Sequence, residues 1–379
     1  MDMSYKEKYF KYKIKYNQLK LNITGSGQQE LHLKLLNNDN GIGLYALAAP
    51  NDCASSTMKI RHYNNIKKVA DGCNPDGLIV YDIQDEPCRD GKPRPFKFVK
   101  KERADLFANF IVKQFPNNPV ILYRAFPESY TKQNVTENDL QDEQTPEQIE
   151  KIIEEKRRKI IDEWMEDTIT KKNMKTLVWI GGNSRRLPKI NDKIPSDYIG
   201  EQIKEKYKDV ISGSVCLPER GDIELELMIT RTQKDCKFFI TQIVYNYKLY
   251  ENLINKYIDE CIKLNIVPSR IIFNFALFGE QKSIEFMKCL GVIFSDEITQ
   301  EITQEIDITK QKTHIDKSYE LCIKIFSDLL TMRKTILSTK KKYIPMGFSV
   351  DVVTGNKLEY EKSINLYNDL KKIMQLNYN

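Results

Sequence analysis

The stretch that decides the fold reads VISGSVCLPERG over residues 210–221 and CKFFITQIVYN over residues 236–246. A helix-length polar segment separates these two apolar runs, so the stretch predicts a strand, a helix and a strand. Each run ends in polar residues, among them Glu219 and Gln242. Because ligands bind at the carboxyl ends of strands in parallel α/β sheets, we expect chemistry first at these ends.

The same alternation of strands and helices continues on both sides of this stretch. Six further apolar runs typical of buried strands begin at Gly41, Gly77, Pro119, Thr176, Arg270 and Ile344. Eight strands with intervening helices in about 335 residues predict an α/β protein with a (β/α)8 TIM barrel. A doubly wound open sheet is the alternative, but the first run lacks the Gly-rich fingerprint that would support it.

The chain divides into a leader, a linker and one large domain. We expect a short amphipathic helix over residues 1–24, a linker over residues 25–40 and the barrel over residues 41–376. Polar tracts near residues 127–150 and 293–312 are interpreted as insertions in the barrel.

The end of the first insertion has the sequence pattern of a helix N-terminus. Thr145 in the N-cap position, Pro146 in the first helical position and Gln148 in the third form a capping box. A long helix is therefore expected from here to about Thr170.

The leader has an aromatic stripe on a basic background. Tyr5, Tyr9, Tyr12, Tyr16 and Leu19 follow one another at steps of four and three, with Lys at most positions between. The stripe predicts packing on the barrel or on a second copy, or docking to a partner. This stretch also resembles the Tyr/Lys leaders of many giant DNA virus proteins, which implies a virion partner through residues 1–20.

The composition is that of a globular protein, with 41% apolar and 30% charged residues. The net charge of +6 is concentrated in residues 1–20, so a basic surface for nucleic acid is not expected. No apolar run reaches the length of about 18 residues that a membrane helix needs, and no signal peptide is recognised. We therefore expect a cytoplasmic protein of the host cell, with packaging in the virion as the alternative.

The cysteines and histidines show no metal-site spacing. Eight Cys are scattered with no CxxC pair, and several lie in apolar runs, so we expect reduced thiols. With three His in the chain, a His-rich metal site is not predicted either.

The ends of the predicted strands supply the candidate site residues. These candidates, to which strand position alone gives no role, are Asp82, Gln84, Asp85, Glu86, Arg124, Gly181, Gly182, Asn183, Glu219, Arg220, Gln242, Tyr245, Asn274, Phe278 and Asp351.

Each group of candidates has a functional and a structural interpretation. The acidic set Asp82, Asp85 and Glu86 suits a cation or a general acid, or simply pairs with nearby arginines. The pair Gly181 and Gly182 suits close approach of a cofactor, or a tight turn.

Two further candidates carry polar groups within or after apolar strands. Glu219 suits a ribityl or sugar hydroxyl, or a salt bridge to Arg220. Gln242 can recognise the edge of a heterocycle through its donor and acceptor, or it can be a satisfied core amide.

The segments SVCLPERG and FFITQIVYN resemble the Pro-Glu and Ile-Thr-Gln-x-x-Tyr segments of methylenetetrahydrofolate reductases. These are flavin-dependent (β/α)8 barrels that reduce a folate-bound methylene group to methyl. The resemblance extends over residues 41–374 and is closest to a divergent branch with GLIVYDIQDE, RPFKF and VCLPER segments. It implies that substrate contacts Gln242 and Tyr45, and that FAD contacts a set formed by Gly181, Gly182, Glu219, Arg220 and Tyr245.

The chain departs from the family where protons are transferred. The family's Glu on the first strand is replaced by the apolar segment Leu44–Leu47, and its Asp after strand four by Asn183. Loss of a positioned acid forfeits about 10²–10⁴ in rate. We hypothesise that Asp85 or Glu86 supplies the missing proton, which makes Asp85, Glu86 and Asn183 the candidate catalytic residues.

Three functions follow from these observations. The first is a flavin-dependent oxidoreductase that passes hydride from NAD(P)H through FAD to a folate or a similar small heterocycle. The second is a barrel that has lost catalysis and acts as a binding or virion-associated protein. The third is a metal-assisted lyase or hydrolase that uses the carboxylates after the second strand.

Overall fold

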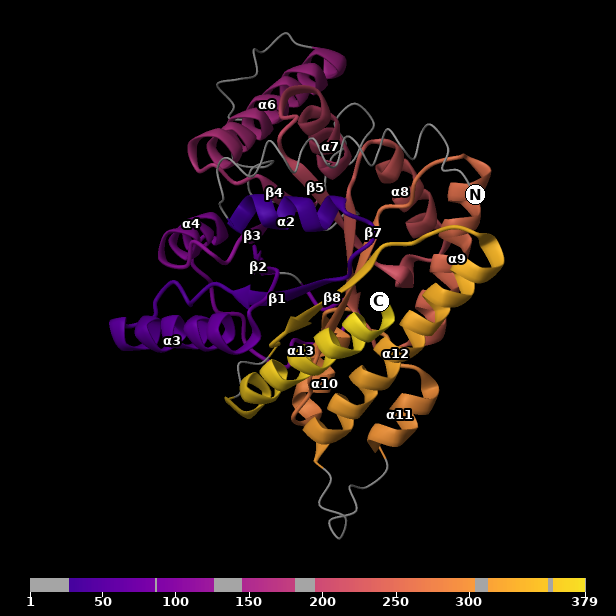
Figure 1. Cartoon of the computed structure of the whole chain (residues 1–379). Helices are drawn as coiled ribbons and strands as arrows, with labels where there is room; N and C mark the ends of the chain where they lie inside the picture. Colours follow the sequence, from indigo (N-terminus) through magenta and orange to yellow (C-terminus); the bar gives the residue numbers. More distant parts are fainter. Residues whose placement is uncertain are drawn as a thin grey trace.

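The structure is a computed structural model that describes residues 27–85, 87–125, 145–180, 195–303, 313–353 and 357–378. Eight parallel strands form a closed barrel in sequential order, with β8 paired to β1 (Figure 1). The predicted (β/α)8 barrel is confirmed. The strands are β1 Ile42–Ala48, β2 Gly77–Tyr81, β3 Val120–Ala125, β4 Thr176–Ile180, β5 Ile211–Cys216, β6 Phe238–Ile243, β7 Arg270–Ala276 and β8 Met346–Asp351.

Helices surround the barrel and connect its strands (Figure 1). The connecting helices are α3 Ser56–Cys73, α4 Ala104–Gln114, α6 Pro146–Glu166, α7 Pro195–Lys206, α8 Asp222–Gln233, α9 Tyr247–Lys263, α10 Gln281–Cys289, α11 Asp296–Thr303 and α12 His314–Lys340; α13 Lys357–Tyr378 follows the last strand. Two short turns follow strand or helix ends, the π turn η2 Asp167–Lys171 and the 3-10 turn η3 Pro218–Arg220.

Strand alternation sorts the apolar side chains into two cores. Inside the barrel lies a cluster that includes Leu44, Ile79 and Ile272, whereas their sequence neighbours pack outward against the helices. Gly213 of β5 is required by this inner packing, because a Cβ there would lie 2.3 Å from the ring of Phe238.

The linker predicted over residues 25–40 is wrong for the part that the structure describes. Residues Gly27–Leu36 form helix α2, which places Leu31 and Leu35 in the inner cluster at the amino-terminal end of the barrel. Buried Arg270 at the start of β7 donates to the carbonyls of Lys34 and Asn40, at 3.1 and 2.9 Å. The helix therefore closes this end of the barrel and leaves the opposite end for chemistry.

The predicted capping box is confirmed. Thr145 Oγ1 accepts from the Gln148 N–H at 3.4 Å, and Gln148 Oε1 accepts from the Thr145 N–H at 2.8 Å. The helical stretch continues through the π turn to Lys171, close to the expected end.

Several predictions concern residues that lie outside the described ranges. These residues include the leader helix, most of the insertion at 127–150 and the second half of the insertion at 293–312. The candidate site residues Glu86, Gly181, Gly182 and Asn183 also lie outside the described ranges. Within the described ranges, no helix is long and apolar enough to cross a bilayer.

Candidate functional site

Five polar side chains gather inside the barrel at the carboxyl ends of its strands. Tyr81 ends β2, Tyr123 lies on β3, Asn274 on β7, and Ser349 and Asp351 on β8. The amide Nδ2 of Asn274 lies 3.5 Å from the Tyr81 hydroxyl, and Ser349 Oγ donates to Asn274 Oδ1 at 3.0 Å. The rings of Tyr81 and Tyr123 meet edge to face, 4.8 Å apart. We call these five residues the mouth cluster.

Asp351 is the acidic member of the mouth cluster. Burial raises the pKa of its carboxyl from 3.8 to about 6, although the Val352 N–H and the side chains of Tyr81 and Asn274 oppose this rise by hydrogen bonding. Burial and the neighbouring Asp351 also raise the pKa of Tyr81 well above its usual range. A carboxyl that titrates near neutral pH can both accept and donate a proton.

Exposure separates the members that a ligand can touch from those that hold them. Asp351 and Tyr81 are half-buried, whereas Tyr123, Asn274 and Ser349 are buried. Asn274 contacts both half-buried members, Ser349 holds Asn274, and Tyr123 packs on Tyr81.

An irregularity in β6 lies beside this cluster. The register between β6 and β7 shifts between Ile240 and Ile243, and Thr241 Oγ1 accepts from the Asn274 N–H at 3.0 Å. Such irregularities often redirect side chains near active sites. Here the irregularity is next to Gln242, one of the predicted substrate residues.

Gln242 already makes hydrogen bonds with the protein. Its Nε2 donates to the Leu290 carbonyl at 2.9 Å, and its Oε1 accepts from the Ile243 N–H at 3.0 Å. An amide has a second N–H and a second lone pair. Recognition of a heterocycle by these remaining groups stays a prediction.

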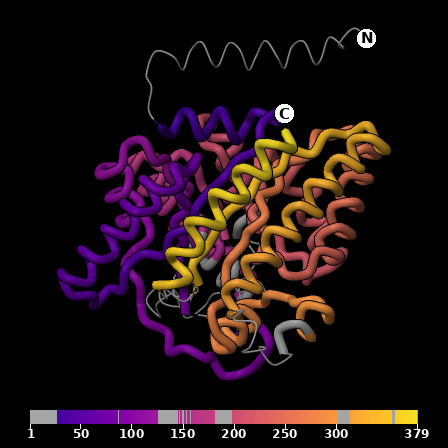
Figure 2. The backbone as a smooth tube through the Cα atoms, turned by 60° about the horizontal axis from the view of Figure 1, so that its bottom comes forward, coloured from indigo at the N-terminus to yellow at the C-terminus, as the bar shows by residue number. Residues whose placement is uncertain are grey.

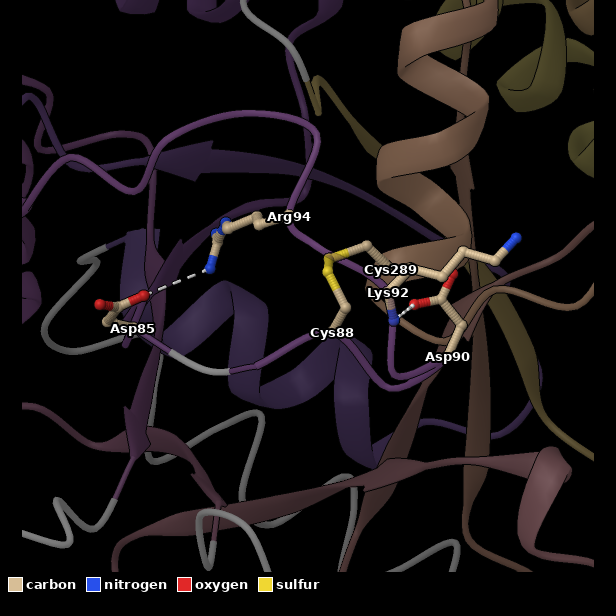
Figure 3. Close-up of a disulfide and its surroundings, with 6 residues drawn as sticks. All are labelled: Asp85, Cys88, Asp90, Lys92, Arg94 and Cys289. Carbon is tan, nitrogen blue, oxygen red and sulfur yellow. Dashed lines mark hydrogen bonds and ion pairs between the residues drawn. A yellow bond between two sulfur atoms is a disulfide. The ribbon is translucent and has the colours of Figure 1, made fainter.

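A long segment links β2 to α4; its residues 87–103 contain no helix or strand, and we call them the strap. A disulfide joins Cys88 of the strap to Cys289 at the end of α10 (Figure 3). Next to it, the Arg89 N–H donates to the Cys289 carbonyl at 2.8 Å, and Arg89 Nη1 lies 2.9 Å from Glu219 Oε1.

The disulfide corrects the expectation that all cysteines are reduced. Cys88 and Cys289 are 201 positions apart in the sequence, yet the fold brings their Cα atoms to 4.3 Å. Sequence spacing cannot show such a long-range approach. The six other cysteines of the chain are free thiols.

The acidic candidates after β2 pair with arginines. Asp85 is 68% exposed and lies 3.6 Å from Arg94 of the strap (Figure 3). Asp82 accepts from the Ala125 N–H at 3.2 Å and lies 3.9 Å from Arg124. In the described part of the chain, no group of three or more His, Cys, Asp or Glu side chains is placed to hold a metal ion.

Glu219 and Arg220 form ion pairs, but not with each other. Glu219 binds Arg89, while Arg220 Nη1 lies 3.5 Å from buried Glu224 on α8. Burial raises the pKa of Glu219, and Arg89 opposes this rise. The predicted contact of these two residues with a cofactor stays a prediction.

Tyr45 and Tyr245, for which ligand contacts stay a prediction, lie buried outside the barrel interior. Tyr45 is fully buried, and its hydroxyl lies 2.6 Å from Ser363 Oγ on α13, because odd positions of β1 point away from the barrel interior. Tyr245 is also fully buried, donates to the Ala276 carbonyl at 2.5 Å and stacks on Phe294. Both tyrosines stabilise the layer between barrel and helices.

Sequence reasoning missed Tyr81, Tyr123 and Ser349, and it gave no role to Asn274 and Asp351. A signal was present: these residues occupy the same alternate positions as the inward apolar residues of their strands, such as Ile79 before Tyr81. Counting from those positions to the strand ends identifies the mouth cluster.

No protein-family model and no curated protein matches the sequence. Among solved structures, the fold is similar to a Clostridium thermocellum protein that binds two copies of 5-methyl-5,6,7,8-tetrahydrofolic acid. That match has a TM-score of 0.62 and 22% identity, and it covers 90% of this chain and 99% of the other. A GH113 β-1,4-mannanase matches with a TM-score of 0.45 and 11% identity, over 89% of this chain and 99% of the other. The first similarity shows the barrel fold.

Proposed function

We propose that the protein binds a reduced folate, or a flat heterocycle of the same kind, at the carboxyl end of the barrel. The observation that carries this proposal is Asp351, held by Tyr81 and Asn274 where barrel enzymes bind their ligands. The similar Clostridium thermocellum barrel, which binds a methylated tetrahydrofolate, supports the choice of ligand.

The chemistry of the ligand matches the mouth cluster. A pterin ring presents a ring N–H and an exocyclic amino group side by side, and a carboxylate can accept from two such parallel donors. Ionised Asp351 supplies that acceptor pair at neutral pH. The half-buried ring of Tyr81 offers an apolar surface for a flat ligand beside it.

A titration calorimetry experiment tests this proposal. We expect saturable binding of 5-methyltetrahydrofolate to the unmodified protein and about 10- to 100-fold weaker binding to Asp351→Asn, because hydrogen bonds to charged groups contribute about 1.5–3 kcal/mol. The control is Asp328→Asn, on the outer helix α12, which should bind like the unmodified protein. Equal affinity of Asp351→Asn, or no binding to the unmodified protein, contradicts the proposal.

A flavin-dependent reductase that uses FAD and NAD(P)H is the second candidate. Its support is the resemblance of the segments that end at Glu219 and Gln242. The described residues fit a flavin poorly, because Tyr245 is buried and Glu219 and Arg220 are held in ion pairs. An absorbance spectrum after incubation with FAD decides: a retained flavin band supports the reductase, and colourless protein argues against it.

The partner expected for residues 1–20 is a separate proposal that rests on the sequence alone. It includes self-association and attachment to a virion. Neither part is needed for ligand binding in the barrel.

A further inference from the structure

We propose that the Cys88–Cys289 disulfide is a latch: it holds the strap across the open end of the barrel, and its reduction gives ligands access to the mouth cluster. The proposal that the strap opens is argued from the contacts of the strap alone. Its effect on a folate rests on the proposed function.

The strap joins opposite sides of the barrel at its open end. In a closed barrel of eight sequential strands, β2 lies opposite β6, which is flanked by β5 and β7. The strap begins six residues after Tyr81, the last residue of β2, and is bound at Glu219, which follows β5, and at Cys289, which follows β7. In Figure 2 it is the purple tube along the lower edge of the molecule that runs to the orange helices.

The far part of the strap is held mainly by the latch. Around the disulfide the strap adds a backbone hydrogen bond and the partly exposed ion pair between Arg89 and Glu219. Exposed ion pairs contribute little stability. Gly91, which follows, has a φ of 75° and no atoms within 4 Å of an added Cβ, so the strap is loosely packed there.

Two other groups of contacts show which parts stay in place after reduction. Phe96 meets Phe286 of α10 edge to face at 5.4 Å, and Lys282 lies over the Phe96 ring. The end of the strap pairs with the segment after β1 through a backbone bridge between Asn51 and Lys101. Arg94 also lies over the Phe286 ring, at 5.4 Å. The segment from Cys88 to Lys92 is therefore the part that the latch controls.

The latch chemistry is ordinary thiol–disulfide exchange with a dithiol reductant. One thiolate of the reductant attacks the sulfur of Cys88, and Cys289 leaves as a thiolate. Cys88 is the more exposed of the two cysteines, with 9% of its surface exposed against 4% for Cys289. The second thiol of the reductant then displaces Cys88, which leaves two protein thiols and the oxidised reductant. A low-molecular-weight disulfide reverses both steps and closes the latch.

Opening also changes the surroundings of the candidate site. When the strap withdraws, Arg89 leaves Glu219 at the end of β5. Leu290, which binds Gln242, is the neighbour of Cys289. Reduction therefore changes the surroundings of two predicted ligand residues, Glu219 and Gln242.

Hydrogen–deuterium exchange of the full chain, oxidised and reduced with dithiothreitol, tests the latch. We expect amides of residues 88–92 to exchange at least about tenfold faster after reduction, with those of β7 unchanged. Cys88→Ser should exchange fast in both states, and the control Cys53→Ser, which removes an exposed free thiol, should respond like the unmodified protein. Equal exchange of residues 88–92 in both states overturns the proposal.

Association kinetics of 5-methyltetrahydrofolate with both states test the gating. A faster association rate for reduced protein and for Cys88→Ser supports the proposal, whereas equal rates with measurable binding overturn it. If neither state binds, the proposed function fails, and the exchange experiment alone decides whether the latch exists.

Discussion

At Asp351 burial and hydrogen bonding act in opposite directions on one carboxyl. Removal from water disfavours the ionised form, while Tyr81, Asn274 and the Val352 N–H favour it. Burial dominates, so the folded protein holds this proton more tightly than the unfolded chain does. The site therefore reduces the stability of the fold at neutral pH, as functional sites often do.

This balance predicts a pH-dependent stability difference. While Asp351 is protonated, below about pH 4, its burial has no ionisation cost; the cost rises with pH and is complete above about pH 6. The Asp351→Asn variant lacks this cost. Its free energy of unfolding should gain up to about 3 kcal/mol relative to the unmodified protein between pH 4 and pH 7.

Urea unfolding of both proteins at several pH values measures this difference. Other carboxyls titrate equally in both proteins and cancel from the comparison. A difference that stays constant from pH 4 to pH 7 would show that the pKa of Asp351 is not raised.

Single residues also show the limit of prediction from the sequence. The residue types at Tyr45 and Tyr245 suited ligand binding, yet the fold buries both side chains in the core between barrel and helices. Asp351 and Asn274 were recognised as strand-end residues, but their roles depend on contacts between β2, β7 and β8 that are distant in sequence.

At the scale of elements, local signals predicted most of the barrel. The capping box at Thr145 and the apolar runs of the eight strands depend on neighbouring residues, so the sequence displays them directly. Helix α2 was missed because its stability comes from tertiary contacts. Its leucines are four positions apart, a weak periodic signal in a short segment, and they are buried only once the barrel has closed.

Because tertiary contacts stabilise α2, its buried residues should contribute more to the stability of the protein than its exposed ones. Replacing Leu31, which is fully buried in the inner cluster, by Ala should lower the free energy of unfolding by about 2–5 kcal/mol. Leu36→Ala in the same helix is the matched control, because Leu36 is exposed, and it should change stability by less than about 0.5 kcal/mol. Similar losses for both variants, measured by urea unfolding, would mean that α2 does not close the barrel.

For the whole molecule, the strand count and order followed from the sequence, but the cross-link between the strap and α10 did not. The strap meets α10 through residues about 200 positions apart, and no local pattern reports such a contact. The same long separation has a thermodynamic consequence. A cross-link over so long a loop restricts the unfolded chain strongly, and disulfides typically contribute about 2–4 kcal/mol.

Reduction should therefore lower the thermal midpoint as well as release the strap. With an unfolding entropy of about 2.1 cal/mol/K per residue, the loss of about 2–4 kcal/mol corresponds to about 2–5 °C for a chain of this length. Differential scanning calorimetry with and without dithiothreitol measures the shift. Cys88→Ser should unfold at the lower midpoint in both conditions, and Cys53→Ser should keep the full shift. A midpoint that does not respond to reductant, together with fast exchange in the strap, would mean that the cross-link acts only on the strap and not on the cooperative unfolding of the barrel.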